Sequence, residues 1–187
     1  MIMLDFDLCD AARLRRDRAY DGLFFIAVRT TRIYCRPVCK VRQPLTRNIE
    51  FFVSAAAAED AGYRPCLRCR PEAAPFCPAW HGIHTMLARA LRLLEAGALD
   101  HGTVDGLCER LGIERQHLSR LFVQHLQASP VQVARTLRTH RAKRLLNNTT
   151  LAMAEVAQQA GFRSVRSFNA AISALYRRTP SALRRTV

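Results

Sequence analysis

The 187 residues leave room for one large domain or two small ones. Lys and Arg number 29 against 15 Asp and Glu, and this formal charge of +14 argues against an acidic partner-binding protein and favours a polyanionic ligand. Hydrophobic residues make up 49% of the chain, which excludes a disordered basic tail because such a chain can bury a core.

Signals for a membrane or for export are missing from the sequence. The longest apolar runs, Leu23 to Val28 and Phe51 to Ala58, are far too short to cross a bilayer. Acidic Asp5 stands where a signal peptide would carry basic residues. We therefore expect a soluble, cytoplasmic protein with no membrane partner.

The first half mixes helix and strand signals and predicts a small α+β unit that buries little on its own. Asp7 or Asp10 lies near the start of the first expected helix, and Ser54 and Gly62 bracket the second. In chain order, we expect a helix over Ala11 to Ala19, strands over Leu23 to Val28, Ile33 to Tyr34 and Phe51 to Val53, and a helix over Ala55 to Ala61.

Four of the seven cysteines form two close pairs within this unit. Cys35 and Cys39 make a Cys-x3-Cys, Cys66 and Cys69 make a Cys-x2-Cys, and 26 residues separate the pairs. Four thiolates at about 2.3 Å make a closed tetrahedral zinc site, which would also supply folding energy. The pattern predicts one Zn²⁺ per chain; four merely buried cysteines and an iron–sulfur centre are the alternatives.

A proline-rich stretch separates two halves of different charge. Three prolines fall between Pro71 and Pro78, which is typical of an interdomain linker. Residues 1–76 hold 13 Lys and Arg against 9 Asp and Glu, whereas residues 77–187 hold 16 against 6. We predict domains at 1–75 and 82–187 with a linker at 76–81. Cys77 and His81 in this linker and His84 just after it offer an incomplete set of metal ligands.

The second half is helical throughout. A short helix, a glycine and a longer helix follow one another in the same order twice. This repeated order predicts two helix-turn-helix units joined by one long helix. The expected helices lie around Ile83 to Leu94, over Val104 to Leu111, around Leu118 to Leu126, from Pro130 to about Leu146, over Ala154 to Ala160, and over Val165 to Tyr176 with Val165, Phe168, Ile172 and Leu175 inward.

Some side chains of this half have an ordinary structural interpretation. We expect Cys9, in the first half, and Cys108 to be small buried hydrophobes. His140 is expected on a helix surface. Four residues of the long helix are expected to meet the backbone of a nucleic acid or solvent: Arg138, Arg141, Lys143 and Arg144.

The run from Phe24 to Cys39, with Thr30-Thr31-Arg32-Ile33-Tyr34-Cys35 at its centre, and the run from Gly62 to Pro71 resemble the zinc domain of the Ada family of bacterial methylation-damage sensors. The resemblance covers roughly residues 5–72 and includes the spacing of all four cysteines. It implies that Cys35, Cys39, Cys66 and Cys69 bind zinc and that Cys35 accepts the methyl group of a DNA methylphosphotriester. Each molecule would act once.

The same resemblance implies DNA-backbone contacts beside this cysteine. By matching positions these are Thr31, Arg42 and Arg64. One residue departs from the family pattern: Arg32 stands where Ada-like domains commonly carry a small residue, often Gly. Its charge adds to phosphate binding or changes the turn before Ile33.

Residues 82–187 resemble the AraC-type DNA-binding domain, most closely from Glu155 to Phe168 and from Tyr176 to Arg185. A recognition helix offers its exposed N-terminal residues to base edges, where Arg pairs with guanine and Gln or Asn with adenine. The candidates are Arg115, Gln116 and Ser119 in the first unit and Arg163, Arg166 and Asn169 in the second.

Together these features predict a single-turnover methyltransferase and transcriptional activator of alkylation-repair genes. Its expected partners are double-stranded DNA, as methylated backbone and as operator, and RNA polymerase, with the protein acting as a monomer on the nucleoid. Two alternatives stay open. One is an AraC-type transcription factor whose zinc site is purely structural, and the other is the N-terminal part of a DNA-3-methyladenine glycosylase fusion.

Overall fold

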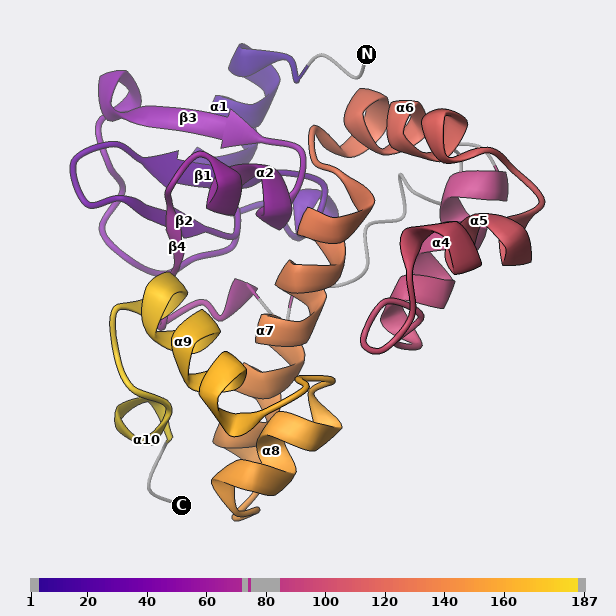
Figure 1. Ribbon diagram of the computed structural model, residues 1–187. Helices are drawn as coiled ribbons and strands as arrows, with labels where there is room; N and C mark the ends of the chain where they lie inside the picture. The colour runs from indigo at the N-terminus through magenta and orange to yellow at the C-terminus, as the bar shows by residue number, and fades with distance from the viewer. Residues whose placement is uncertain (1–3, 72–73, 75–84, 185–187) are drawn as a thin grey trace.

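Two structural halves lie side by side along one long helix, α7 (Pro130–Asn148), as Figure 1 shows. The computed structural model describes residues 4–71, 74 and 85–184. The first half comprises α1 (Phe6–Arg15), β1 (Phe25–Val28), β2 (Ile33–Cys35), β3 (Ile49–Phe52), α2 (Ala55–Asp60) and β4 (Arg64–Pro65), with 3-10 turns at Arg18–Tyr20 and Thr46–Asn48.

The sheet of the first half brings the two cysteine pairs together. Its strand order is β3-β1-β2-β4, with β1 antiparallel to β2 and to β3 and β4 parallel to β2. In the short parallel pair, the backbone N–H of Cys66 donates to the carbonyl oxygen of Tyr34 over 2.9 Å. Cys66 therefore begins its loop directly beside Cys35, the last residue of β2.

Each face of this sheet buries a small core of its own. Phe24 and Ile26 pack with α1 residues Cys9 and Ala12 on one face. On the other face a cluster around Phe25, Ala27, Tyr34, Ala58 and Tyr63 packs against α2. The alternation of neighbouring residues between faces follows from the period-two geometry of a strand.

Helix α1 begins earlier than the sequence analysis expected. The side chain of Asp5, not Asp7 or Asp10, caps the helix by accepting the N–H of Leu8 over 3.0 Å. Phe6 in the first turn lies against Phe51 with ring centroids 5.1 Å apart, and this contact holds the early turn on the sheet.

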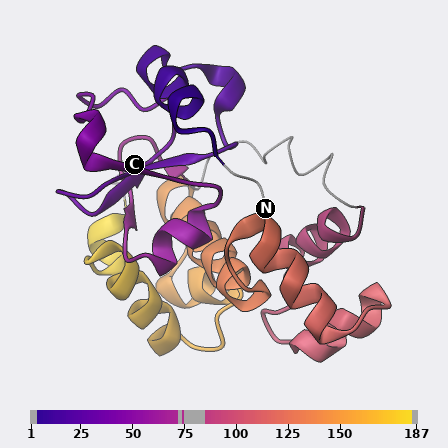
Figure 2. The same ribbon diagram turned by 90° about the horizontal axis from the view of Figure 1, so that it is seen from above.

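The second half consists of helices that build two helix-turn-helix units, one toward each end of α7 (Figure 1). In Figure 2, seen from above, the pink helices of the first unit and the yellow helices of the second lie on opposite sides of the picture. The predicted ranges Val104–Leu111 and Val165–Tyr176 agree with the structure. The helices are α4 (Thr85–Glu95), α5 (Val104–Leu111), α6 (Arg115–Leu126), α7, α8 (Met153–Gln159), α9 (Val165–Tyr176) and α10 (Pro180–Leu183). In α9 the prediction was wrong for Val165, which is exposed, whereas Tyr176 is buried.

A buried carboxylate, Asp100, joins the two units through α7. Nη1 of Arg141 lies 2.6 Å from Oδ2 of Asp100 and donates to the carbonyl oxygen of Ala160 over 3.2 Å. Nε of Arg138 lies 3.7 Å from Oδ1 of the same carboxylate. The expectation that these two arginines face nucleic acid or solvent was therefore wrong, because an acidic residue 38 to 41 positions away neutralises them. It was wrong for Lys143 as well, which is buried and donates to the carbonyl oxygen of Leu183 over 3.0 Å.

Several sequence predictions fall outside the described ranges. These are the linker at 76–81 and the residues Cys77, His81 and His84. Within residues 4–71, 74 and 85–184, no helix is long and apolar enough to cross a bilayer.

Candidate metal centre

The sulfur atoms of Cys35, Cys39, Cys66 and Cys69 all lie within 4.8 Å of one another. Cys35 ends β2, and Cys39 follows in a turn closed by its N–H to the carbonyl oxygen of Arg36 over 3.1 Å. Cys66 and Cys69 flank the loop that leaves β4. The first three side chains are buried and Cys69 is half-buried.

This cluster fits a tetrahedral zinc ion in size and in chemistry. A Zn–S distance of about 2.3 Å requires sulfurs about 3.8 Å apart, within the observed limit. Without a cation the four thiols compete for protons: hydrogen bonds to Cys39, Cys66 and Cys69, together with burial, raise the pKa of the Cys35 thiol. The hydrogen bond from Cys35 lowers the pKa of Cys39 to about 7. One divalent ion removes this conflict by holding all four as thiolates.

A backbone hydrogen bond reaches one sulfur of the cluster. The N–H of Arg36 donates to the sulfur of Cys69 over 3.4 Å. Because a hydrogen bond draws electron density from a thiolate, this contact makes the Cys69 sulfur a weaker nucleophile.

Arg36 ties the two cysteine loops to each other. Its Nε donates to Oδ1 of Asp21 over 2.8 Å, and its Nη1 donates to the carbonyl oxygen of Cys69 over 3.3 Å. This arginine, which follows Cys35 directly, is therefore a structural brace and not a cation available for phosphate.

Two arginines of the α1 region hold the loop that forms the outer wall of the site. Nη1 of Arg13 donates to Oε1 of Gln43 over 3.0 Å, and Nε of Arg16 donates to the carbonyl oxygen of Cys39 over 3.1 Å. Arg42, a predicted phosphate contact, lies between these anchors and is exposed. Neither arginine was predicted as part of the site from the sequence, since pairs 23 to 30 residues apart leave no local signal.

A cleft of about 560 Å³ opens beside the cluster and contains two of the three predicted backbone contacts. Cys35, Cys39 and Cys66 line it together with Thr31 and Arg42. The third predicted contact, Arg64, lies in a separate cleft of about 570 Å³.

Arg32 occupies a backbone conformation that explains why a small residue suits its position. Its φ is 53°, in the left-handed region that favours glycine. The guanidinium carbon lies 4.7 Å from the ring centroid of Tyr63, and Nη2 is 3.5 Å from the carbonyl oxygen of Ala61. A cation–π contact thus holds this charge against the first half.

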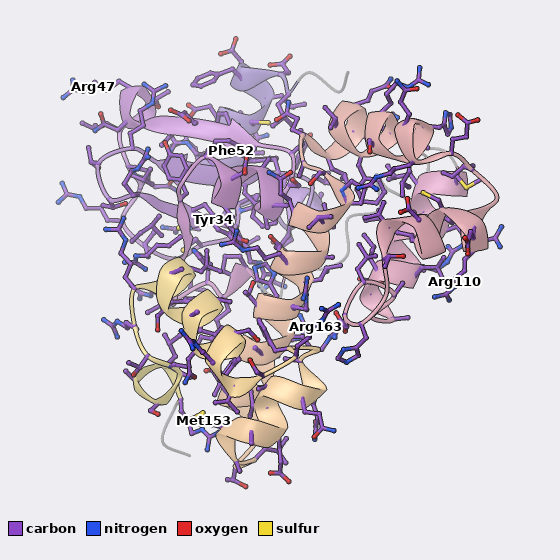
Figure 3. The ribbon with its side chains drawn as sticks, viewed as in Figure 1. Tyr34, Arg47, Phe52, Arg110, Met153 and Arg163 are labelled. Atoms are coloured by element: carbon purple, nitrogen blue, oxygen red, sulfur yellow. The ribbon has the colours of Figure 1, made fainter. Side chains whose placement is uncertain are left out.

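Polar side chains join the β2 strand directly to α7. The hydroxyl of Tyr34 donates to Oε1 of Glu59 over 2.8 Å and lies 3.1 Å from Nε2 of His140. Oγ1 of Thr136 donates to Oε2 of Glu59 over 2.5 Å. His140 is 7% exposed, so its predicted place on a helix surface was wrong. Figure 3 labels Tyr34 on the part of the first half that faces α7.

The predicted base-reading residues lie at the N-terminal ends of α6 and α9. Arg115 and Gln116 are exposed on α6, and Ser119 is half-buried one turn later. Arg163 precedes the cap of α9, and Arg166 and Asn169 are exposed on it. Figure 3 shows Arg163 beside α7, at the turn between α8 and α9.

Two family models match separate parts of the chain. The sequence model of a family described as the metal binding domain of Ada matches residues 8–72, and that of a helix-turn-helix domain matches residues 107–186. The chain is 42% identical over 180 residues to the "Probable bifunctional transcriptional activator/DNA repair enzyme AlkA" of Mycobacterium tuberculosis. It is 41% identical over 109 residues to the "Bifunctional transcriptional activator/DNA repair enzyme Ada" of Escherichia coli.

These relatives are longer than the chain. The first alignment covers 96% of this chain and 36% of the relative, and the second covers 58% and 29%. Among solved structures, a Chromobacterium violaceum transcriptional regulator with an AraC-type DNA-binding domain is 28% identical. The match covers 56% of this chain and 93% of that one, with a TM-score of 0.50. A small sheet domain with a four-cysteine zinc site is thus followed by a helical AraC-type domain.

Proposed function

Because this chain belongs to the proteins that join the metal-binding domain of Ada to an AraC-type helix-turn-helix domain, we propose that it takes methyl groups from DNA methylphosphotriesters. We propose further that this transfer makes the protein a transcriptional activator of alkylation-repair genes. Cys35 is the acceptor, and Cys39, Cys66 and Cys69 complete the zinc site.

One observation supports the choice of Cys35: it belongs to the four-cysteine cluster and lines the cleft together with Thr31 and Arg42, two predicted phosphate contacts. Cys39 and Cys66 line the same cleft, and the resemblance to the Ada family selects Cys35 among the three. A purely structural zinc site does not require this cleft.

The chemistry needs no general base. Bound zinc keeps the four sulfurs ionised at neutral pH and leaves the centre with a net charge of −2. A lone pair of the Cys35 sulfur forms the new S–C bond as the methyl C–O bond breaks, and the phosphodiester anion leaves with the electron pair. The resulting thioether has no route back, so each chain accepts one methyl group.

The charged residues around the cleft orient the DNA backbone. Arg42 and Thr31 line the cleft, which supports a pairing of the Arg42 guanidinium with a phosphate next to the neutral triester and a hydrogen bond from the Thr31 hydroxyl to a phosphate oxygen. Methylation removes one negative charge from a surface that faces DNA, which strengthens binding. Repair of the backbone is thereby converted into tighter DNA binding.

The AraC-type half reads the operator. Two recognition helices, α6 and α9, present exposed polar residues at their N-terminal ends. Because one monomer carries both recognition helices, it needs no symmetric partner to contact two successive stretches of major groove. Activation then requires a contact with RNA polymerase.

Intact-mass measurement tests the transferase function. Zinc-loaded protein is incubated with a duplex that carries methylphosphotriesters and, as the control, with the same duplex unmethylated. We expect the mass of one methyl group per chain and no second turnover. Folded, zinc-loaded protein that gains no methyl would reduce the centre to a structural site.

Selection of binding sites tests the regulatory function. Protein before and after methyl transfer is used to select duplexes from a random pool. We expect one common sequence to be enriched, with tighter binding by the methylated protein. If the protein binds the selected sequence with equal affinity before and after methyl transfer, the transfer does not regulate DNA binding.

A further inference from the structure

We propose that the cleft between the two halves is a second binding site for DNA phosphates. It would hold the backbone next to the methylated phosphate, with Arg135 and Arg177 of the helical half acting together with Arg64. This inference rests on the proposed function for the identity of the DNA strand. It adds residues from the helical half to the methyl-acceptor surface.

The cleft is built from both halves. Its volume is about 570 Å³, and most of its lining side chains are polar or charged. The first half contributes the Thr30–Arg32 turn, the end of α2 and Arg64 of β4. The helical half contributes Gln132, Arg135 and Thr136 of α7 and the C-terminal end of α9, which packs on β4 (Figure 1).

The acidic groups of the cleft already have partners. Glu59 accepts hydrogen bonds from Tyr34 and Thr136. Oδ1 of Asp60 accepts a hydrogen bond from Nε2 of Gln132 over 2.5 Å. Neither carboxylate is ion-paired with an arginine of the cleft in the part of the chain that the structure describes. Their hydrogen-bond donors here are neutral, so both keep their charge, but the four arginines that line the cleft outnumber them.

Three arginines of the cleft remain without a protein counter-charge. Arg32 lies on the Tyr63 ring, whereas no ion pair or side-chain hydrogen bond to a described residue involves Arg64, Arg135 or Arg177. Arg135 and Arg177 are exposed, and the three come from separate elements. Like charges gathered in one cleft repel each other until an anion joins them. Guanidinium groups match phosphate oxygens in geometry as well as in charge.

The two clefts are neighbours along the protein surface. Thr30 and Thr31 line both of them, so the turn between β1 and β2 is the ridge that separates the acceptor site from the second cleft. A backbone strand that presents a phosphotriester to Cys35 and crosses this ridge brings its following phosphates to Arg64, Arg135 and Arg177. The AraC-type half would thereby help to hold the substrate.

Salt-dependent DNA binding tests this assignment without methyl transfer. Each lost phosphate contact reduces the slope of log affinity against log salt by about 0.9. We expect the full chain with Arg135→Gln and Arg177→Gln to bind an unmethylated duplex more weakly, with a slope shallower by about 1.8, and each single variant to show about half of that change. Circular dichroism verifies that the variants are folded.

Arg110→Gln is the matched control. Arg110 is an exposed arginine on α5, and Figure 3 shows it on the opposite side of the molecule from the first half. This control should keep the wild-type slope. A double variant with the wild-type slope and affinity would overturn the proposal.

A second experiment distinguishes DNA phosphate from free phosphate. Inorganic phosphate is titrated into wild type and the double variant at constant ionic strength, with calorimetric detection. We expect no saturable binding to either protein. Saturable binding to wild type that the double variant loses would assign the cleft to a small anion and overturn the assignment to DNA. Neither experiment uses Cys35, so a wild type that accepts no methyl would refute the proposed function separately.

Discussion

At the scale of single residues, the described cysteines fall into two chemical classes. Four form the cluster, whereas Cys9 and Cys108 each lie buried among apolar side chains. Burial raises the pKa of both single thiols, that of Cys9 to about 11, with a further contribution from the charge of Asp5. Their function is packing, as the sequence predicted.

This difference predicts the reactivity of Cys9 toward iodoacetamide. With a pKa of about 11, about one Cys9 thiol in a thousand is ionised at pH 8, and only the thiolate reacts. We expect peptide mapping to find Cys9 unlabelled in the native protein at pH 8 and fully labelled in denaturant. Labelling of native Cys9 at the rate of a free thiol would contradict the assigned burial.

A second residue-scale prediction concerns Arg13, which is 2% exposed. Its guanidinium pairs with Asp10 and donates to Oγ1 of Thr46 over 2.8 Å. Arg13→Met leaves Asp10 without its counter-charge and removes the hydrogen bonds that hold the loop at the outer wall of the acceptor cleft. We expect the free energy of unfolding to fall by about 2–3 kcal/mol, less than for a fully buried pair because Asp10 is partly exposed.

Urea denaturation of the zinc-loaded protein measures this change. Arg15→Met is the matched control, because Arg15 is an exposed arginine of the same helix. We expect the free energy of unfolding of the control variant to fall by less than about 0.5 kcal/mol. Equal costs for the two variants would show that the contacts of Arg13 contribute nothing specific.

At the scale of elements, the turns of the two helix-turn-helix units differ in one testable way. Gly112 and Gly161 both have positive φ, 69° and 86°. A Cβ on Gly112 would meet nothing within 4 Å, whereas a Cβ on Gly161 would overlap the Asp100 carboxylate. Asp100 cannot easily move aside, because Arg141 holds it.

We therefore expect unequal costs for alanine at these two glycines. Gly112→Ala should lower the free energy of unfolding by about 1–2 kcal/mol, the cost of a left-handed residue with a side chain. Gly161→Ala should cost at least about twice as much, since it also disrupts the contact of Asp100 with α7. Denaturant unfolding of both variants measures the difference. Equal values would show that Asp100 does not fix this turn.

Local signals predicted most of the elements. Ser54 caps its helix as expected, because a cap is a contact between residues three positions apart. The two residues of β4 carry no pattern, so the parallel pair that brings Cys66 to Cys35 was not predicted. The Cys-x3-Cys and Cys-x2-Cys spacings nevertheless predicted the cluster, since two close pairs of cysteines suffice to indicate a shared metal site.

Contacts between distant parts of the chain were beyond sequence reasoning. Tyr34 and His140 are 106 residues apart, and an isolated histidine on a helix has no feature that reveals its partner. The same holds for Asp100 and Arg141. Such pairs depend on how whole elements pack, which composition and periodicity do not specify.

At the scale of the whole molecule, the two halves depend on zinc to different degrees. The helical half contains two cores of its own, around Phe122 and around Phe168. The first half has two small clusters and four crowded thiols. When zinc is removed, the four thiols again compete for protons and no longer link the two cysteine pairs. Only the two small apolar clusters then stabilise the sheet.

We expect a chelator to unfold the first half while α8 and α9 stay folded. Amide NMR of the full chain follows both halves at once. Resonances of β1 and β2 should lose their dispersion after zinc removal, and those of α9 should keep it. Preserved dispersion in β1 and β2 would show that packing alone holds the sheet.

In the proposed function, the zinc centre accepts a methyl group on one sulfur, that of Cys35. Peptide mapping after reaction with methylphosphotriester DNA tests this assignment, because it locates the methyl group among the four cysteines of the cluster, Cys35, Cys39, Cys66 and Cys69. We expect all of the methyl on Cys35 and no methylation of Cys35→Ala. Methyl on another sulfur of the cluster, or unmodified cysteines in folded zinc-loaded protein, would contradict it.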